Sequence, residues 1–369
     1  MTVLLEEAVN SYTKTYMAGN QALGRNLDAN AMRNHFYRFP GVDNDKDKTL
    51  SAMLRMAVIA QTQERYEKAP VETDEQRAEK AALEGLVKQL FVELKRDFKP
   101  SDLPPYTLVK LGMHLAGTSQ PEESIAYFDE ILDPSEPDPV RKKARINGMS
   151  KYRKNAVFGK AVALGRSKDN AKVDTAIKMM RDELSKEESS SNPDRKAMED
   201  AQYNLVKFTF ARQDWPAVIA AADKYRENKT YKKNLPEVLY LQGEAYLKQN
   251  ELDKALINFM NITGTYKGLV KWSAPAVLAQ MDTLWKRNTM SQGAGKQPSD
   301  RYVAWKAGSQ YVQLLDTPAN RKKMTAEDSA LVNEVKDKTA KFGSDPAVSQ
   351  ERADIAAYEA AVRAAKGQK

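Results

Sequence analysis

Three aspartates at alternating positions come closest in this chain to the spacing of a metal site. Asp43, Asp45 and Asp47 in VDNDKDKTLSAML match the first three ligands of a calcium-binding EF-hand loop. Such a loop also needs glycine at its sixth position and a bidentate glutamate at its twelfth, where this chain has Lys48 and Leu54. We interpret the segment as a polar loop before a helix and predict no metal site.

Side chains that carry out nucleophilic or acid–base catalysis are scarce. The chain has no cysteine, which excludes thiolate catalysis, disulfides and cysteine-ligated metals. Of its two histidines, His35 stands without a supporting motif, and His114 lies in an expected helix between Leu111 and Leu115, where a packed imidazole is the simpler interpretation. The sequence therefore predicts no catalytic residues and no cofactor, although an all-helical enzyme whose site converges from distant helices stays an open alternative.

A glycine-rich stretch, SQGAGKQPSD at 291–300, superficially resembles a phosphate-binding P-loop. It lacks the first glycine, the Ser or Thr after the lysine and the preceding strand that such a loop requires. We interpret it as a connection between helices.

A basic run offers a second kind of chemistry. Between Arg141 and Lys168 the chain has ten basic residues and no acidic one, within a net charge of +8. Such a run can bind phosphates, with Tyr152 and Phe158 as faces for stacked bases. The candidate basic patch consists of Arg141, Lys142, Arg145, Lys151, Arg153 and Lys154. On a helix these charges point in all directions, so a solvated face, or one paired with acidic residues at 182–194, is the competing interpretation.

The candidate residues described above lie in a chain whose apolar residues have the spacing of α-helices. Apolar residues recur three and four apart, as in the stretch from Leu83 to Leu94, and alternating strand patterns are missing. We expect an all-α fold of about sixteen helices joined by short Pro-, Gly- and Ser-containing links.

The stretch YLQGEAYLKQNELDKALINF, residues 240–259, predicts how neighbouring helices pack. Gly243 and Ala255 are small residues where two antiparallel helices would cross, and the turn falls at 249–251. Tyr246 and Phe259 each lie one helical turn beyond the small residue on the same face. The spacing predicts a closely packed helical hairpin.

This pattern resembles the tetratricopeptide repeat, a hairpin of about 34 residues with a small residue at position 8, tyrosine near 11, alanine at 20 and an aromatic residue at 24. Gly243, Tyr246, Ala255 and Phe259 fill these four positions, whereas Lys267 replaces the usual proline at position 32. A degenerate copy has Val206, Thr209, Val218 and Ala222 at the four positions, and a third copy has Gly112, Ser124 and Phe128.

The resemblance implies a right-handed α-solenoid with a concave groove. We expect a poorly matching helical region at 1–100, repeats at 101–288, and C-terminal helices at 289–369 that include a capping helix with Ile355, Tyr358 and Val362 on one stripe. Relatives that bind extended peptides line the groove from the first helix of each repeat. Those positions correspond here to Asp200, Tyr203, Lys207, Phe210 and Ala211 in one copy and to Glu237, Tyr240, Glu244, Leu247 and Lys248 in the next. The candidate groove residues are Tyr203, Lys207, Phe210, Tyr240, Glu244, Leu247 and Lys248.

The resemblance thus implies a non-catalytic scaffold that binds a segment of a partner protein, with Lys207 and Lys248 available to hold a carboxylate. Packing of the aromatic residues against the next helix is the alternative for that site. The alternative function is anion or nucleic-acid binding by residues 141–168. The start MTVLLEEAVNSYTK is no export signal, and no apolar run is long enough to span a membrane. Residues 240–285 are similar to bacterial envelope repeat proteins, so we expect the periplasm or cell envelope if a leader was removed, and otherwise the cytoplasm.

Overall fold

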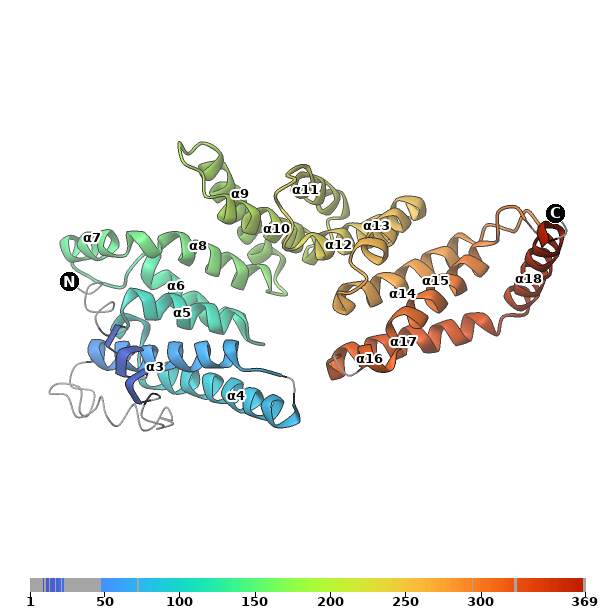
Figure 1. The fold of residues 1–369 in the computed structure, drawn as a ribbon. Helices are drawn as coiled ribbons and strands as arrows, with labels where there is room; N and C mark the ends of the chain where they lie inside the picture. Colours follow the sequence, from blue (N-terminus) through green and yellow to red (C-terminus); the bar gives the residue numbers. More distant parts are fainter. Residues whose placement is uncertain are drawn as a thin grey trace. The chain divides into compact units, whose positions relative to one another are not determined.

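In the part of the chain that it describes, the computed structural model is all-α, with the helices α3 to α18, further helical residues between 9 and 22, two short 3-10 segments and no strand (Figure 1). It describes residues 48–367 except 72, 294, 322 and 323, together with 9, 11, 12, 14–16, 18–20 and 22. Asp43, Asp45, Asp47 and His35 lie outside these residues. The predicted all-α fold of consecutively packed helices is confirmed.

The chain divides into two compact units, residues 1–179 and 180–369. The first unit contains α3 (Lys48–Lys68), α4 (Asp74–Asp97), η2 (Pro100–Asp102), α5 (Pro105–Ala116), η3 (Pro121–Ser124), α6 (Ile125–Leu132), α7 (Pro139–Gly148) and α8 (Ser150–Gly165). The division falls within α9 (Asn170–Glu188). The second unit contains α10 (Arg195–Ala211), α11 (Trp215–Glu227), α12 (Leu235–Lys248), α13 (Leu252–Thr265), α14 (Val270–Arg287), α15 (Asp300–Leu315), α16 (Pro318–Arg321), α17 (Ala326–Gly343) and α18 (Pro346–Gly367).

One aromatic ring organises the core of the first unit. Phe128 of α6 is fully buried, and a Cβ added to Gly112 of α5 or to Gly159 of α8 would lie 2.8 or 2.2 Å from its ring. The crossing predicted from Gly112 and Phe128 therefore forms, and the same ring also contacts the next helix. Nearby, His114 stacks on Phe91 with ring centroids 4.0 Å apart, and burial lowers the pKa of His114. The histidine is part of the packing.

The same contact recurs in the second unit. Phe259 of α13 is fully buried, and a Cβ on Gly243 of α12 would lie 2.6 Å from its ring. Ala255 is also fully buried at this crossing. The hairpin predicted from residues 240–259 is thus confirmed in its packing.

The degenerate copy forms an equivalent hairpin from α10 and α11. Its four residues, Val206, Thr209, Val218 and Ala222, are all buried. Both hairpins turn on a residue with left-handed backbone, Gln213 (φ 58) and Asn250 (φ 62), which are 37 positions apart. In both turns the next amide donates to a carbonyl five residues earlier, Asp214 to Thr209 at 3.1 Å and Glu251 to Tyr246 at 2.9 Å. This is a Schellman-type helix end, so the repetition extends to the caps.

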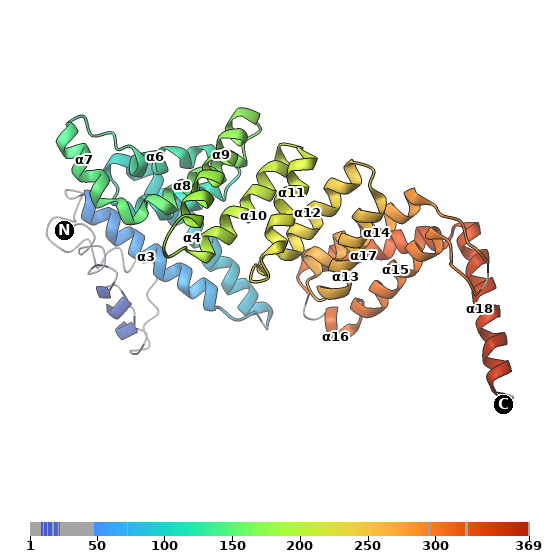
Figure 2. The same ribbon diagram turned by 90° about the horizontal axis from the view of Figure 1, so that it is seen from above.

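Helices of the second unit pack in two layers, whose order can be followed in Figure 2. The first helix of each hairpin contacts the first helix of the next, so that α10, α12, α14 and α17 form a row. On that row, α11 packs between α10 and α12, α13 between α12 and α14, and α15 between α14 and α17. Helix α18 ends the series on α15 and α17. None of the helices described is both long and apolar enough to cross a bilayer.

We expect Gly243→Ala to lower the free energy of unfolding of the second unit by about 1–3 kcal/mol, because the new methyl group would overpack the Phe259 ring. The matched control is Gly264→Ala in α13, where an added Cβ meets nothing within 4 Å. It should be neutral, or stabilising by up to about 1 kcal/mol.

Denaturant titration, monitored by tryptophan fluorescence, measures the free energy of unfolding of the second unit in each variant. All four tryptophans lie in that unit: Trp215, Trp272, Trp285 and Trp305. Equal stability of the two variants would contradict the close crossing.

Candidate functional site

The row formed by α10, α12, α14 and α17 carries side chains that link each helix to the next. Between α10 and α12, the Tyr203 hydroxyl donates to a Glu237 carboxylate oxygen at 2.6 Å. The Lys207 ammonium lies 3.7 Å from the other Glu237 oxygen and 5.2 Å from the centre of the Tyr203 ring. Burial, and then the hydrogen bond to Glu237, raise the pKa of Tyr203, so its hydroxyl remains a donor. The three groups form a paired cluster.

Aromatic rings link α12 to α14. Tyr240 is half-buried, with its ring centroid 6.4 Å from that of Trp272 and 5.9 Å from that of Phe259. Burial and the neighbouring Glu244 carboxylate raise the pKa of Tyr240 to about 12. The Lys271 ammonium lies 5.5 Å from the centre of the Trp272 ring. Two aromatic side chains and a carboxylate therefore adjoin one another where α12 meets α14.

Glu244 is the unusual charge in this row. It is half-buried, and burial raises its pKa, while the field of Asp282 acts in the same direction. Lys248 and the Tyr240 hydroxyl oppose this rise. Asp282 itself is 2.5 Å from the Lys338 ammonium of α17. Among the described residues, no cationic group lies within ion-pair distance of Glu244, which is thus a partly desolvated carboxylate without a salt bridge.

We call this set of side chains the row surface. It consists of Asp200, Tyr203, Lys207, Glu237, Tyr240, Glu244, Lys248, Trp272, Asp282, Glu334 and Lys338.

The predicted groove residues divide between this surface and the core. Tyr203, Lys207, Tyr240, Glu244 and Lys248 belong to the row surface. Lys207, predicted to be available for a ligand carboxylate, is engaged with Glu237.

Two other predicted groove residues pack inside the hairpins. Phe210 meets Trp215 of α11 edge to face, with centroids 5.5 Å apart. Leu247 is half-buried against the cluster around Leu239 and Phe259. Tyr203 and Tyr240 are likewise half-buried, and each contacts the next first helix of the row, as the packing alternative expects.

Four of the eleven residues of the row surface come from helices without the repeat signature. Trp272 and Asp282 lie on α14, and Glu334 and Lys338 on α17. In the α14–α15 hairpin the sizes at the crossing are reversed, because Met281 on the first helix meets Gly308 on the second, where an added Cβ would lie 2.8 Å from the Met281 sulfur. A template that looks for a small residue on the first helix passes over this hairpin.

Pairing within the first unit neutralises part of the candidate basic patch. Lys142 lies 2.6 Å from Asp133, and Arg145 lies 3.0 Å from the buried Glu130. Arg145 also donates to the Ser101 carbonyl at 3.1 Å. These acidic partners precede the basic run in the chain, whereas the sequence suggested acidic residues after it.

The remaining members of the basic patch differ in exposure. Lys151 lies 4.9 Å from the centre of the Tyr152 ring. Arg141, Lys151 and Arg153 are exposed, and Lys154 is half-buried.

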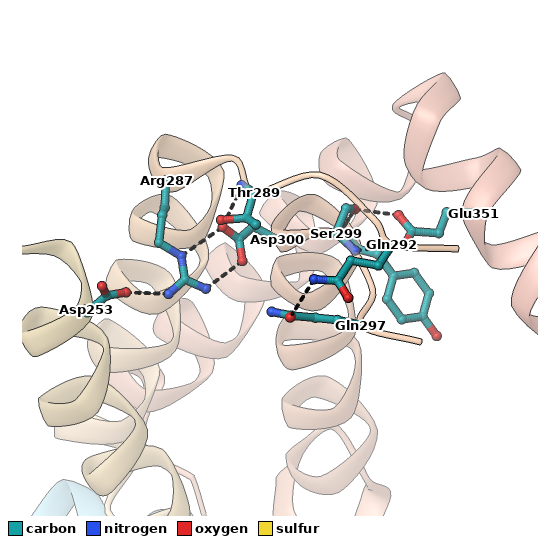
Figure 3. Close-up of polar contacts among 9 residues, drawn as sticks. Asp253, Arg287, Thr289, Gln292, Gln297, Ser299, Asp300 and Glu351 are labelled. Carbon is teal, nitrogen blue, oxygen red and sulfur yellow. Dashed lines mark hydrogen bonds and ion pairs between the residues drawn. The ribbon is translucent and has the colours of Figure 1, made fainter. Parts of the chain in front are cut away.

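The glycine-rich loop after α14 holds α18 in place. Gly293 and Gly295 adopt left-handed backbone (φ 104 and 78), and a Cβ on Gly295 would lie 2.4 Å from the Tyr358 ring of α18. Figure 3 shows Ser299 facing Glu351 of α18, which accepts hydrogen bonds from the Ser299 amide and hydroxyl. Loop and helix enclose a cavity of about 810 Å³. These glycines thus serve packing, in keeping with the interpretation as a connection.

At the start of this loop, Arg287 joins two carboxylates (Figure 3). It makes a bidentate contact with the buried Asp300, at 2.8 and 2.6 Å, and also lies 2.5 Å from the exposed Asp253. Burial alone would raise the pKa of Asp300, but hydrogen bonds from Arg287 and from the Thr289 amide together lower it. In the residues described, no group of three His, Asp or Glu side chains is arranged to hold a metal ion.

No family model, curated protein or solved structure matches this chain.

We expect Asp300→Asn to destabilise the second unit by roughly 2–4 kcal/mol, because it removes a buried partner of Arg287. Asp253→Asn is the matched control. It removes the exposed partner of the same arginine and should cost no more than about 1 kcal/mol. Denaturant titration followed by tryptophan fluorescence compares the two.

The effect of Asp300→Asn should also depend on pH. Because the folded-state pKa of Asp300 is below its unfolded value of about 4, its stabilising contribution is present above that pH and is lost as the pH falls through the folded pKa. The stability difference between wild type and variant should shrink between pH 6 and pH 3. A constant difference would show that the ionised carboxylate contributes nothing.

Proposed function

We propose that this protein is a non-catalytic scaffold that binds an extended segment of a partner protein along the row surface. The observation that carries the proposal is a set of three side-chain contacts that link four successive first helices, Tyr203–Glu237 between α10 and α12, Tyr240–Trp272 between α12 and α14, and Asp282–Lys338 between α14 and α17. These contacts set half-buried aromatic rings beside charged groups, which is the composition of energetically important interface positions.

The distance between equivalent positions on successive helices of the row corresponds to a few residues of an extended bound segment. Tyr203 and Tyr240 occupy the same place in successive hairpins, as do Lys207 and Glu244. Packed helices lie about 8–10 Å apart, and an extended chain rises about 3.3 Å per residue. One step along the row therefore corresponds to roughly three residues of a bound segment, so that successive side chains of that segment meet successive helices.

Rigidity of the row favours binding. Tight crossings such as Gly243–Phe259 fix the helices before a partner arrives, and a pre-organised surface loses less conformational entropy on association. The tetratricopeptide-repeat resemblance of residues 240–259 supports the same assignment. On the likeness of residues 240–285 to bacterial envelope repeat proteins, we further propose that the protein acts in the periplasm or cell envelope.

The alternative functions have less support. Lys142 and Arg145 of the basic patch already pair with Asp133 and Glu130, which reduces the charge available to a nucleic acid. For an enzyme, the row surface supplies carboxylates, phenols and amines but no nucleophile with an adjacent base.

We predict that a photoreactive side chain at Lys248 or Glu334 of the row, introduced in the cells that produce the protein, crosslinks to one discrete partner. Both positions are exposed. The control position is Lys224, which is exposed on α11 in the other layer and should give no such adduct.

Mass spectrometry of the adducts identifies the partner. Adducts at Lys224 equal to those at Lys248 and Glu334, or the absence of any adduct at the row positions, would contradict the proposal.

A further inference from the structure

The charges of the row surface are unequally compensated. Each of two lysines already has a carboxylate partner, Lys207 with Glu237 and Lys338 with Asp282. Two half-buried carboxylates, Asp200 and Glu244, have no cation within ion-pair distance among the described residues. The row surface therefore carries negative charge that no nearby cation among the described residues balances, above all at Glu244.

Burial makes this negative charge costly. A half-buried carboxylate loses part of its hydration, and a second carboxylate nearby adds repulsion. Both conditions hold at Glu244, where burial and the field of Asp282 oppose ionisation. Lys248 acts on Glu244 only from beyond ion-pair distance. A cation placed against Glu244 would relieve both penalties, which gives the site a preference for positively charged groups.

The neighbouring aromatic rings also favour a positively charged side chain. The Tyr240 ring lies beside Glu244 and 6.4 Å from the Trp272 ring, and aromatic faces attract lysine and arginine within about 6 Å. Trp272 already accepts the ammonium group of Lys271, 5.5 Å from its ring centre. The methylene stem of a bound lysine or arginine can lie on such rings while its charge reaches the carboxylate.

We infer that the occupant of the row surface is a cationic extended segment of a partner protein, with a lysine or arginine side chain held at Glu244 beside Tyr240. This rests on the function proposed above and adds the sign of the ligand. An acidic segment could contact the exposed Lys248, but Lys207 is already paired with Glu237, and the segment would bring negative charge to Glu244 and Asp282.

The test uses a random dodecapeptide library selected on the full chain. We expect enriched peptides to share a lysine or arginine, and the tightest one to be taken forward as the probe. Its affinity, measured by fluorescence anisotropy, should fall about tenfold with Glu244→Gln, a loss of about 1.4 kcal/mol. Glu227→Gln, which changes an exposed carboxylate on α11, is the matched control and should leave the affinity within twofold. Tryptophan fluorescence checks that both variants are folded.

A double-mutant cycle then links the two charges. Replacing the key lysine or arginine of the peptide by norleucine should weaken binding to the wild type about tenfold and to Glu244→Gln hardly at all, because the partner charge is already gone. Independent losses in the two experiments would overturn the contact.

Two other outcomes separate this inference from the function on which it rests. Enrichment of acidic peptides whose binding depends on Lys248 rather than on Glu244 would leave the scaffold proposal standing and overturn the cationic ligand. Selection that enriches no peptide on the row surface would overturn both.

Discussion

The close approach of a phenylalanine ring to a helical glycine is the contact on which the rest of this structure depends. Phe128 fits against Gly112 and Gly159 in the first unit, and Phe259 fits against Gly243 in the second. Each ring fills space that a Cβ would occupy, so the two helices of a hairpin can approach closely. Repetition of such hairpins sets the first helices side by side, and that row determines which side chains stand next to one another.

Much of this could be predicted from the sequence, because small and aromatic residues at fixed intervals report helix crossings directly. The crossings at Gly243 and Gly112 follow from such spacing, as does the burial of Val206 and Ala222 in the degenerate copy. The α14–α15 hairpin, at 269–316, is expected as a hairpin without the repeat signature, because its small residue, Gly308, lies on the second helix. The spacing of apolar residues predicts which face of a helix is buried. It does not predict which of the two helices in a hairpin carries the small residue at the crossing.

The charge pairs of the site could not be predicted in this way. Lys207 meets Glu237, and Asp282 meets Lys338 across 56 residues of sequence. Such pairs depend on how neighbouring helices are rotated, which helical periodicity does not specify. The same rotation sets Phe210 against Trp215 and Leu247 against the cluster around Phe259, and among the described residues it leaves Glu244 without a cation at ion-pair distance. Where the sequence suggests a site for a carboxylate, the arrangement of charges leads us to propose a site for a cation.

The most direct test of the account is fluorine NMR of the full chain labelled with 5-fluorotryptophan, during titration with a peptide or partner segment that binds it. The four tryptophans give separate reporters. Trp272 lies beside Tyr240 on the row surface, and Trp305 packs under Arg352 of α18. The account predicts that the Trp272 resonance changes most and that the Trp305 resonance stays in place. A change confined to Trp305, or no change at Trp272 at saturation, would show that the row surface is not where this protein binds.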